Sequence, residues 1–272
     1  MLSEIISFYA ELFAGHRWLL AALAAVLGLL VGSFLNVAAI RLPVKRSIVY
    51  PPSHCASCNH RLSVIDLVPV LSYILLRGKC RYCGRKISPY YAVGEAVTAV
   101  LFAVIAWQTG FLADLVIGLL MAAVLMTASM SDLFYRLIPD KLVLFGIVTG
   151  GLLRLWHHPL PLWNYALASF LGGAILFALA MLASALMRKE ALGGGDLKLF
   201  AFIGIMLGIK LTLLTIFVSS LLGSIIGIAL IATGKMKRDA YIPFGPFIGA
   251  AGILVFLWGE RWINLYFSLI TS

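Results

Sequence analysis

The amino-acid sequence predicts an all-α polytopic membrane protein. Of its 272 residues, 62% are apolar and only 12% are charged, about half the charged fraction usual for soluble domains. The apolar residues gather in eight runs that approach or exceed the roughly 20 residues a helix needs to cross a bilayer. These runs cover residues 18–40, 90–107, 111–130, 142–156, 162–187, 197–209, 211–233 and 243–258. We therefore expect about eight transmembrane helices.

Two of the eight runs are short. Residues 142–156 and 197–209 would need packing against neighbouring helices, or flanking polar residues, in order to span. A count of six or seven spans therefore stays open.

The basic residues that give the chain its net charge of +10 are distributed unevenly between the two sides of the predicted membrane topology. With the amino terminus outside, 17 of the 21 Lys and Arg residues fall on one side, and only Arg17, Arg154, Lys210 and Arg261 lie opposite. The positive-inside rule places the basic loops in the cytoplasm, and eight spans then put the carboxyl terminus outside as well. The charge distribution favours an inner-membrane protein that binds no nucleic acid.

The amino-terminal residues carry Glu4 and Glu11 and no base before His16, unlike the positive start of a cleavable secretory signal. We expect no such signal. The apolar spacing of Ile5, Phe8 and Leu12 predicts an amphipathic helix on the outer membrane surface.

All four cysteines lie in the one large polar insertion, residues 41–88, between the first two spans. They form two CxxC pairs, Cys55 with Cys58 and Cys80 with Cys83, a spacing typical of tetrahedral zinc sites. The reducing cytoplasm disfavours a lasting disulfide, so we expect a zinc-binding loop, with free cysteines as the alternative. Four protein ligands leave no open position for water, so the metal would be structural.

The same loop also contains two histidines and an apolar stretch in its middle. His54 and His60 adjoin the first pair, and we leave both out of the metal site because histidines are common on exposed loops. The stretch from Ile65 to Leu76 is apolar but too short to cross, so we expect it to rest on the cytoplasmic interface.

Two aspartates at the cytoplasmic side are the candidate catalytic residues. Asp132 ends a long apolar helix, where the helix dipole disfavours a negative charge, so capping does not explain it. Asp196 follows Gly193, Gly194 and Gly195 and opens the sixth run; capping could explain it, or the glycines could let a substrate approach closely.

Paired aspartates support aspartic-protease chemistry. One carboxylate activates a water molecule while its protonated partner polarises the scissile carbonyl. The helix dipoles predict that Asp132 holds the proton and Asp196 is the base. Asp140, which follows Pro139, fits helix capping. Glu95, about one turn into the second span, binds either a nearby cation such as Arg85 or an amine or cofactor.

These residues resemble those of the bacterial type IV prepilin peptidases, which are GxGD membrane aspartic proteases of peptidase family A24. The run of three glycines before Asp196 is similar to the segment of the second catalytic aspartate, and Ser131–Asp132 to that of the first. The resemblance extends to Gly32–Val37, the paired cysteines, Gly94–Glu95 and Ile242–Pro246.

The resemblance implies that the substrates are prepilins of type IV pili and pseudopilins of type II secretion. Cleavage at the cytoplasmic membrane face would remove a basic leader peptide, typically after a glycine. Family members with the cysteine loop commonly also methylate the new amino terminus with S-adenosylmethionine, so we expect both activities. Glu95 is the candidate contact to the amine or cofactor, since no Rossmann glycine motif is visible.

We expect an N-terminal region, residues 1–107, with the cysteine loop at 41–88, and an aspartic peptidase membrane domain, residues 108–272. Two other functions remain as alternatives: a cation transporter with carboxylates in its path, or a metal-sensing scaffold. The clustering of acidic residues at one membrane face disfavours a transport path.

Overall fold

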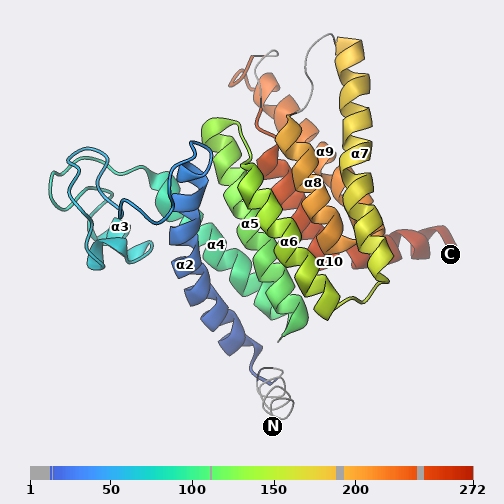
Figure 1. Cartoon of the computed structure of the whole chain (residues 1–272), viewed down its shortest axis with the longest axis horizontal. Helices are drawn as coiled ribbons and strands as arrows, with labels where there is room; N and C mark the ends of the chain where they lie inside the picture. Colours follow the sequence, from blue (N-terminus) through green and yellow to red (C-terminus); the bar gives the residue numbers. More distant parts are fainter. Residues whose placement is uncertain (1–12, 14, 111, 188–192, 238–241, 272) are drawn as a thin grey trace. The chain divides into compact units, whose positions relative to one another are not determined.

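The computed structural model describes the chain except residues 1–12, 14, 111, 188–192, 238–241 and 272 (Figure 1). The predicted amphipathic helix around Ile5 and Phe8 lies outside the described residues. The described part is helical, with no strand, which confirms the predicted all-α class. It divides into two compact units, Met1–Met130 and Ser131–Ser272.

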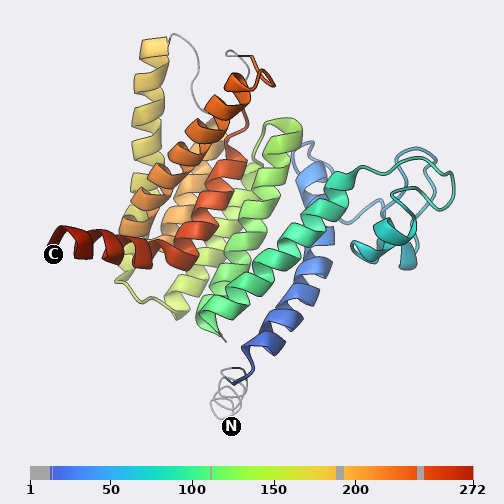
Figure 2. The ribbon, with the colours of Figure 1, turned by 180° about the vertical axis from the view of Figure 1, so that it is seen from behind.

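The described residues of the first unit form two complete long helices, the cysteine loop between them and most of a third helix. Helix α2 (Arg17–Arg41) leads into a loop with a short 3-10 turn, η1 (Ile65–Leu67), and a short helix, α3 (Leu71–Leu75). Helix α4 (Pro89–Thr109) follows, and α5 (Ala113–Tyr135) begins in this unit and ends in the second. Figure 2 shows α2 beside α4.

Small residues bring α2 and α4 close together. A Cβ added to Gly28 would lie 2.7 Å from the Cα of Ala99, and one added to Gly32 would lie 3.0 Å from the Cα of Glu95. Helices in a bilayer associate through this kind of close contact, because lipid provides no hydrophobic drive for helix association. The pairing of α2 with α4 therefore depends on glycine on α2.

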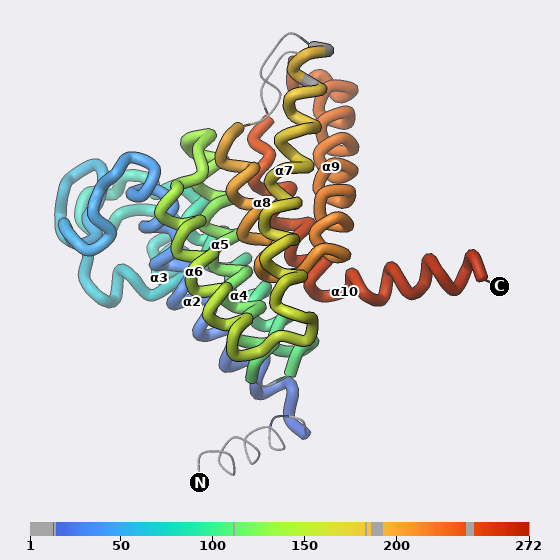
Figure 3. The backbone as a smooth tube through the Cα atoms, turned by 45° about the vertical axis from the view of Figure 1, so that its right-hand side comes forward, coloured from blue at the N-terminus to red at the C-terminus, as the bar shows by residue number. Residues whose placement is uncertain are grey.

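After the end of α5, the described residues of the second unit form five helices. These are α6 (Asp140–Trp156), α7 (Leu162–Met187), α8 (Gly194–Leu207), α9 (Ile209–Ala232) and α10 (Gly245–Thr271). Helix α8 contacts α6, α7 and α9, and α9 contacts α7 and α10. Figure 3 shows that α10 changes direction, so that its last turns run away from α9; the predicted apolar run ended at 258.

Each of the eight predicted runs overlaps one of these long helices, but their lengths differ. Within the described residues, six helices are long and apolar enough to cross a membrane: α2, α4, α5, α7, α9 and α10. Helix α6 has 17 residues and α8 has 14, and these are the two runs whose spanning the sequence left open. The protein is a multi-pass membrane protein with at least six candidate spans among its described helices.

The short helix α8 is held at both ends by α6. Near its start, Lys198 donates to the Asp140 carboxylate, with 2.7 Å between Nζ and Oδ1. At its end, the buried guanidinium of Arg154 donates to the Met206 carbonyl, 3.1 Å from Nε, and lies over the Tyr165 ring. The last carbonyls of a helix need such donors where no water reaches them.

We predict that Gly204→Ala destabilises the second unit. The new Cβ would lie 2.4 Å from the backbone of Ala168, so α7 and α8 would have to separate, at a cost of about 1–3 kcal/mol. Thermal unfolding of the purified protein in detergent measures the effect. The control is Gly173→Ala in the same interface, where the added Cβ meets only the Leu197 carbonyl, at 3.5 Å. Equal melting temperatures for the two variants would contradict this prediction.

Candidate active site

Asp132 lies in the last turns of α5 and is buried, with 3% of its surface exposed. Its Oδ2 accepts the backbone N–H of Gly245 at 2.7 Å. A Cβ at Gly245 would lie 2.9 Å from both Cβ and Oδ2 of Asp132, so only glycine allows this approach without a shift. The start of α10 therefore orients the Asp132 carboxyl group, a contact that the sequence did not indicate.

A tight turn after Asp132 reverses the chain toward α6. The N–H of Arg136 donates to the Asp132 carbonyl at 2.8 Å, and Arg136 has a left-handed backbone, with φ of 54°. The hydroxyl of Ser131 donates to the Leu137 carbonyl at 2.6 Å. This turn places Ile138, which is buried, against the start of α8.

Asp196 lies in the first turn of α8 and is also buried, with 4% of its surface exposed. Its N–H donates to the Gly193 carbonyl at 3.1 Å. Asp196 and Asp132 belong to the same compact unit, and their carboxyl groups are close enough to interact electrostatically. The structure thus brings together the two predicted aspartates from α5 and α8.

The three glycines before Asp196 differ in their surroundings. Gly193 precedes α8 with extended backbone, and none of the three has a positive φ. A Cβ at Gly195 would lie 3.0 Å from the Cβ of Ile138, so this glycine permits close packing with the turn after Asp132. A Cβ at Gly194 would meet nothing within 4 Å, so this exposed position has room for another molecule.

Other carboxylates near the ends of helices have structural partners. Asp140, at the start of α6, pairs with Lys198, and Glu260 pairs with Lys210, with 2.6 Å between Nζ and Oε2. The N-cap residue of α6 is Pro139, so Asp140 lies in the first turn of the helix, where the helix dipole and its ion pair explain its charge. Ion pairing therefore accounts for both of these carboxylates.

The four cysteine sulfurs of the loop form a cluster. Cys55, Cys58, Cys80 and Cys83 place all their Sγ atoms within 4.8 Å of one another, and those of Cys55 and Cys83 are 3.9 Å apart. Tetrahedral zinc with bonds of about 2.3 Å requires sulfurs about 3.8 Å apart. The thiols therefore fit a metal ion of this size, as their spacing predicted.

Backbone hydrogen bonds shape both CxxC turns. The N–H of Cys55 donates to the His60 carbonyl and the N–H of Cys80 to the Arg85 carbonyl, at 2.9 and 2.8 Å. Backbone N–H groups of Cys58 and Ser57 near the Cys55 sulfur lower the pKa of its thiol to about 6. This favours the thiolate, which is the form that binds metal.

The two histidines beside the first pair are engaged elsewhere. His54 Nδ1 lies 3.0 Å from the Pro52 carbonyl oxygen, and the ring of His60 lies against Tyr82 with 3.6 Å between centroids. Neither belongs to the group of side chains that could hold the metal.

Glu95, on α4, lies in the first unit and is buried. Its Oε2 accepts the N–H of Val70 at 2.8 Å, so a loop backbone group binds it where the sequence suggested Arg85. On α2, the buried Asn36 donates to the Tyr91 carbonyl at 2.9 Å, while its Oδ1 has no hydrogen-bond partner within the described residues. A Cβ at Gly94 would lie 2.6 Å from this oxygen.

Sequence reasoning assigned no site role to Asn36, Arg154 or Gly245. Only Arg154 carries a charge, and the sequence placed it among the four bases opposite the cytoplasmic side. Asn36 and Gly245 lie within Gly32–Val37 and Ile242–Pro246, which the family resemblance had marked without giving a role.

We predict that the purified parent protein holds about one zinc ion per chain and that Cys58→Ser lowers this content, because three thiolates form an incomplete tetrahedron. Elemental analysis of protein purified without chelators measures it. The matched control is His60→Gln, which should keep the metal. A parent without zinc, or equal loss in both variants, would overturn the assignment.

Comparisons with known proteins cover nearly the whole chain. The model of the bacterial peptidase A24 N-terminal domain matches residues 26–109, and that of the type IV leader peptidase family matches residues 119–228. The predicted domain boundary, 107/108, remains a proposal.

Several relatives are named prepilin leader peptidase/N-methyltransferase. That of Bacillus subtilis is 35% identical over 244 residues, covering 90% of this chain and 96% of the relative. That of Pseudomonas putida is 33% identical over 261 residues, covering 88% and 91%, and that of Neisseria gonorrhoeae is 34% identical over 258 residues, covering 86% and 89%. No solved structure matches this chain. The chain belongs to the type IV leader peptidase family.

Proposed function

We propose that this protein is a membrane aspartic endopeptidase that removes leader peptides from type IV prepilins and type II secretion pseudopilins and then N-methylates the new amino terminus. The observation that carries the proposal is the pair of buried aspartates, Asp132 and Asp196, in one compact unit, where Gly195 packs against the turn that follows Asp132. The names of the relatives, prepilin leader peptidase/N-methyltransferase, supply the substrate class.

The two aspartates would cleave the peptide bond without a covalent intermediate. One carboxylate takes a proton from the attacking water, and the protonated partner donates a hydrogen bond to the scissile carbonyl. The Oδ2 of Asp132 already accepts the Gly245 N–H, which leaves Oδ1 as the oxygen that carries a proton toward the substrate. The N–H contact itself favours the carboxylate form, so the assignment of Asp132 as the acid and Asp196 as the base depends on the helix dipoles.

The membrane orientation is part of the proposal. We place the amino terminus outside and the basic loops, the cysteine cluster and both aspartates at the cytoplasmic face of the inner membrane. Exposed Gly194 then offers an open approach beside Asp196 for an extended substrate backbone. The cysteine cluster would hold zinc as a structural ion, because its four thiolates satisfy a tetrahedral ion.

For methylation we propose Glu95 and Asn36 as the residues that bind the substrate's new amino terminus. The Oδ1 of Asn36 is a buried acceptor without a hydrogen-bond partner among the described residues, and it lies close to the backbone of Gly94, where a Cβ would be 2.6 Å away. Glu95 would accept the proton that the amine loses. These features fit an amine site, and S-adenosylmethionine supplies the methyl group when it is bound.

We predict that Asp132→Asn and Asp196→Asn each reduce leader removal by about 100-fold or more, because each variant removes one member of the acid–base pair. Co-expression with a prepilin and measurement of the processed fraction tests this. Glu260→Gln, which changes an exposed carboxylate that pairs with Lys210, is the control and should keep most activity. Normal processing by a stably folded Asp132 or Asp196 variant would remove the mechanism.

We predict that Gly245→Ala lowers kcat for leader removal by about 10-fold with little change in KM, because its Cβ would displace the Asp132 carboxyl group. Steady-state cleavage of a prepilin in detergent measures both constants. The control is Gly151→Ala, whose Cβ would meet only Ile205, at 3.9 Å. Unchanged kcat in Gly245→Ala would show that this contact does not orient Asp132.

We predict that Glu95→Gln reduces methylation while leader removal continues. Gln keeps a carbonyl oxygen for the Val70 N–H, so the variant removes the charge and preserves the hydrogen bond. Mass spectrometry of the processed pilin amino terminus, with S-adenosylmethionine supplied, gives both activities in one reaction. Full methylation by the variant would exclude Glu95 as the proton acceptor.

A further inference from the structure

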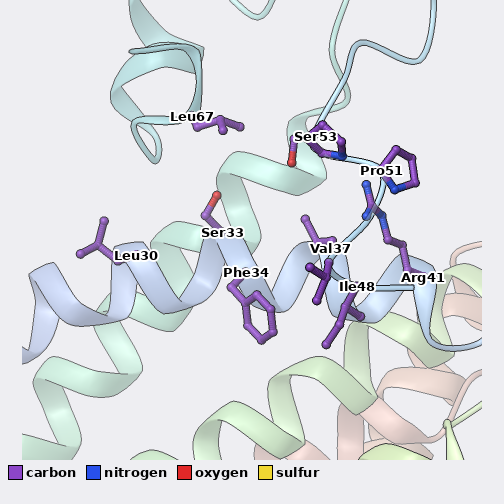
Figure 4. Close-up of a pocket in the computed structure, with 11 residues that line it drawn as sticks. Leu30, Ser33, Phe34, Val37, Arg41, Ile48, Pro51, Ser53 and Leu67 are labelled. Carbon is purple, nitrogen blue, oxygen red and sulfur yellow. The ribbon is translucent and has the colours of Figure 1, made fainter. Parts of the chain in front are cut away.

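A pocket outside both proposed active sites lies between α2 and the cysteine loop. It has a volume of about 330 Å³ and is lined by one face of α2 and by loop residues 48, 49, 51–53 and 67. Figure 4 shows its residues in order along α2, from Leu30 at one end to Arg41 at the other, with Pro51 beside Arg41. Asn36, Glu95 and the four cysteines do not line it.

The pocket changes from apolar to cationic along its length. Leu30, Phe34 and Val37 line the part along α2 that precedes Arg41, and Arg41 lies at the end of the helix. Leu30 is 60% exposed and Phe34 51% exposed, on a helix that is a candidate membrane span, so this face of α2 meets acyl chains. The guanidinium donates to the Ser47 carbonyl through Nη1, and the hydroxyl of Ser53 also lines the pocket.

The length of the pocket matches one leaflet of a bilayer. Leu30 and Arg41 are eleven residues apart on α2, which is about 16 Å along the helix axis. One leaflet contributes about 15 Å of hydrocarbon to the bilayer core. A lipid with its phosphate at Arg41 would therefore have its chain end beside Leu30.

The charge of the loop favours an anionic lipid. Residues 41–88 contain nine Lys and Arg residues and one carboxylate, Asp66. Asp66 is already paired with Arg81 at 2.7 Å, and its hydrogen bonds from Ser63, with Arg81, hold its pKa well below the usual range. Basic segments next to a membrane span attract anionic lipid headgroups.

We propose that the pocket binds one anionic phospholipid, with its phosphate at Arg41 and Ser53 and one acyl chain along Leu30, Phe34 and Val37. The volume of this pocket is near the lower end of the range for ligand sites, which fits one acyl chain and the phosphate. The second acyl chain of the lipid would lie in the bilayer. The bound lipid would fill the space between α2 and the loop that carries the cysteine cluster.

Native mass spectrometry of the full-length protein tests the proposal. The protein is released from nanodiscs that contain equal parts of phosphatidylglycerol and phosphatidylcholine, and the lipids it retains are counted. The parent should retain phosphatidylglycerol in preference to phosphatidylcholine. Arg41→Gln should retain about fivefold less, because it removes one cation beside the phosphate. The matched control is Arg46→Gln, a base of the same loop that does not line the pocket, which should behave as the parent does.

A second variant keeps the test decisive if Arg41→Gln folds poorly. Val37→Trp fills the apolar part of the pocket without changing any charge and should also lose the retained lipid. Equal retention of the two lipids by the parent would overturn the anionic preference. Equal retention by Arg41→Gln and Arg46→Gln, or full retention by Val37→Trp, would show that the lipid binds elsewhere. Release of the lipid by added glycerol phosphate would show a simple phosphate site and overturn the acyl-chain contact.

Discussion

The hydrogen bonds from Arg154 to the Met206 carbonyl hold one end of α8, and the position of Asp196 at its other end depends on them. A helix of 14 residues cannot reach across a bilayer, so its terminal backbone groups must find partners inside the protein. Helix α6 supplies a donor at the far end through Arg154, and it contacts the near end through the exposed ion pair of Asp140 with Lys198. Gly204 allows α7 to pack directly on α8. The base of the proposed reaction thus sits on a helix fixed along its length.

Around α8, backbone contacts made by glycines position residues of the proposed site. Gly245 directs an N–H to the Asp132 carboxylate, and Gly195 lets the turn after Asp132 pack against the start of α8. Both contacts require the absence of a side chain, because a Cβ would lie 3.0 Å or less from its neighbour. Gly195 and Gly245 thus serve close packing, whereas Gly194 has the open surroundings that substrate approach needs.

The first unit combines the cysteine cluster with the residues proposed for methylation. Val70, in the loop, donates to Glu95 on α4, so the loop and the span are joined by a partly buried hydrogen bond. A metal ion that fixes the two CxxC turns would restrict the loop that carries Val70. The proposed structural zinc would thus be connected to Glu95 through the loop, although the zinc would take no part in peptide cleavage.

The sequence by itself determined the helical membrane class, the cysteine cluster and the aspartates worth testing, because hydropathy, CxxC spacing and charge at a helix end are local signals. The sequence did not decide whether the two short runs that form α6 and α8 cross the bilayer. For runs of marginal length, spanning depends on packing against neighbouring helices. Tertiary structure alone decided that Gly245 contacts Asp132, 113 positions away, and that Val70, a backbone donor, binds Glu95. A backbone N–H is present at nearly every residue, so the sequence carries no mark of the one that folding brings to a carboxylate.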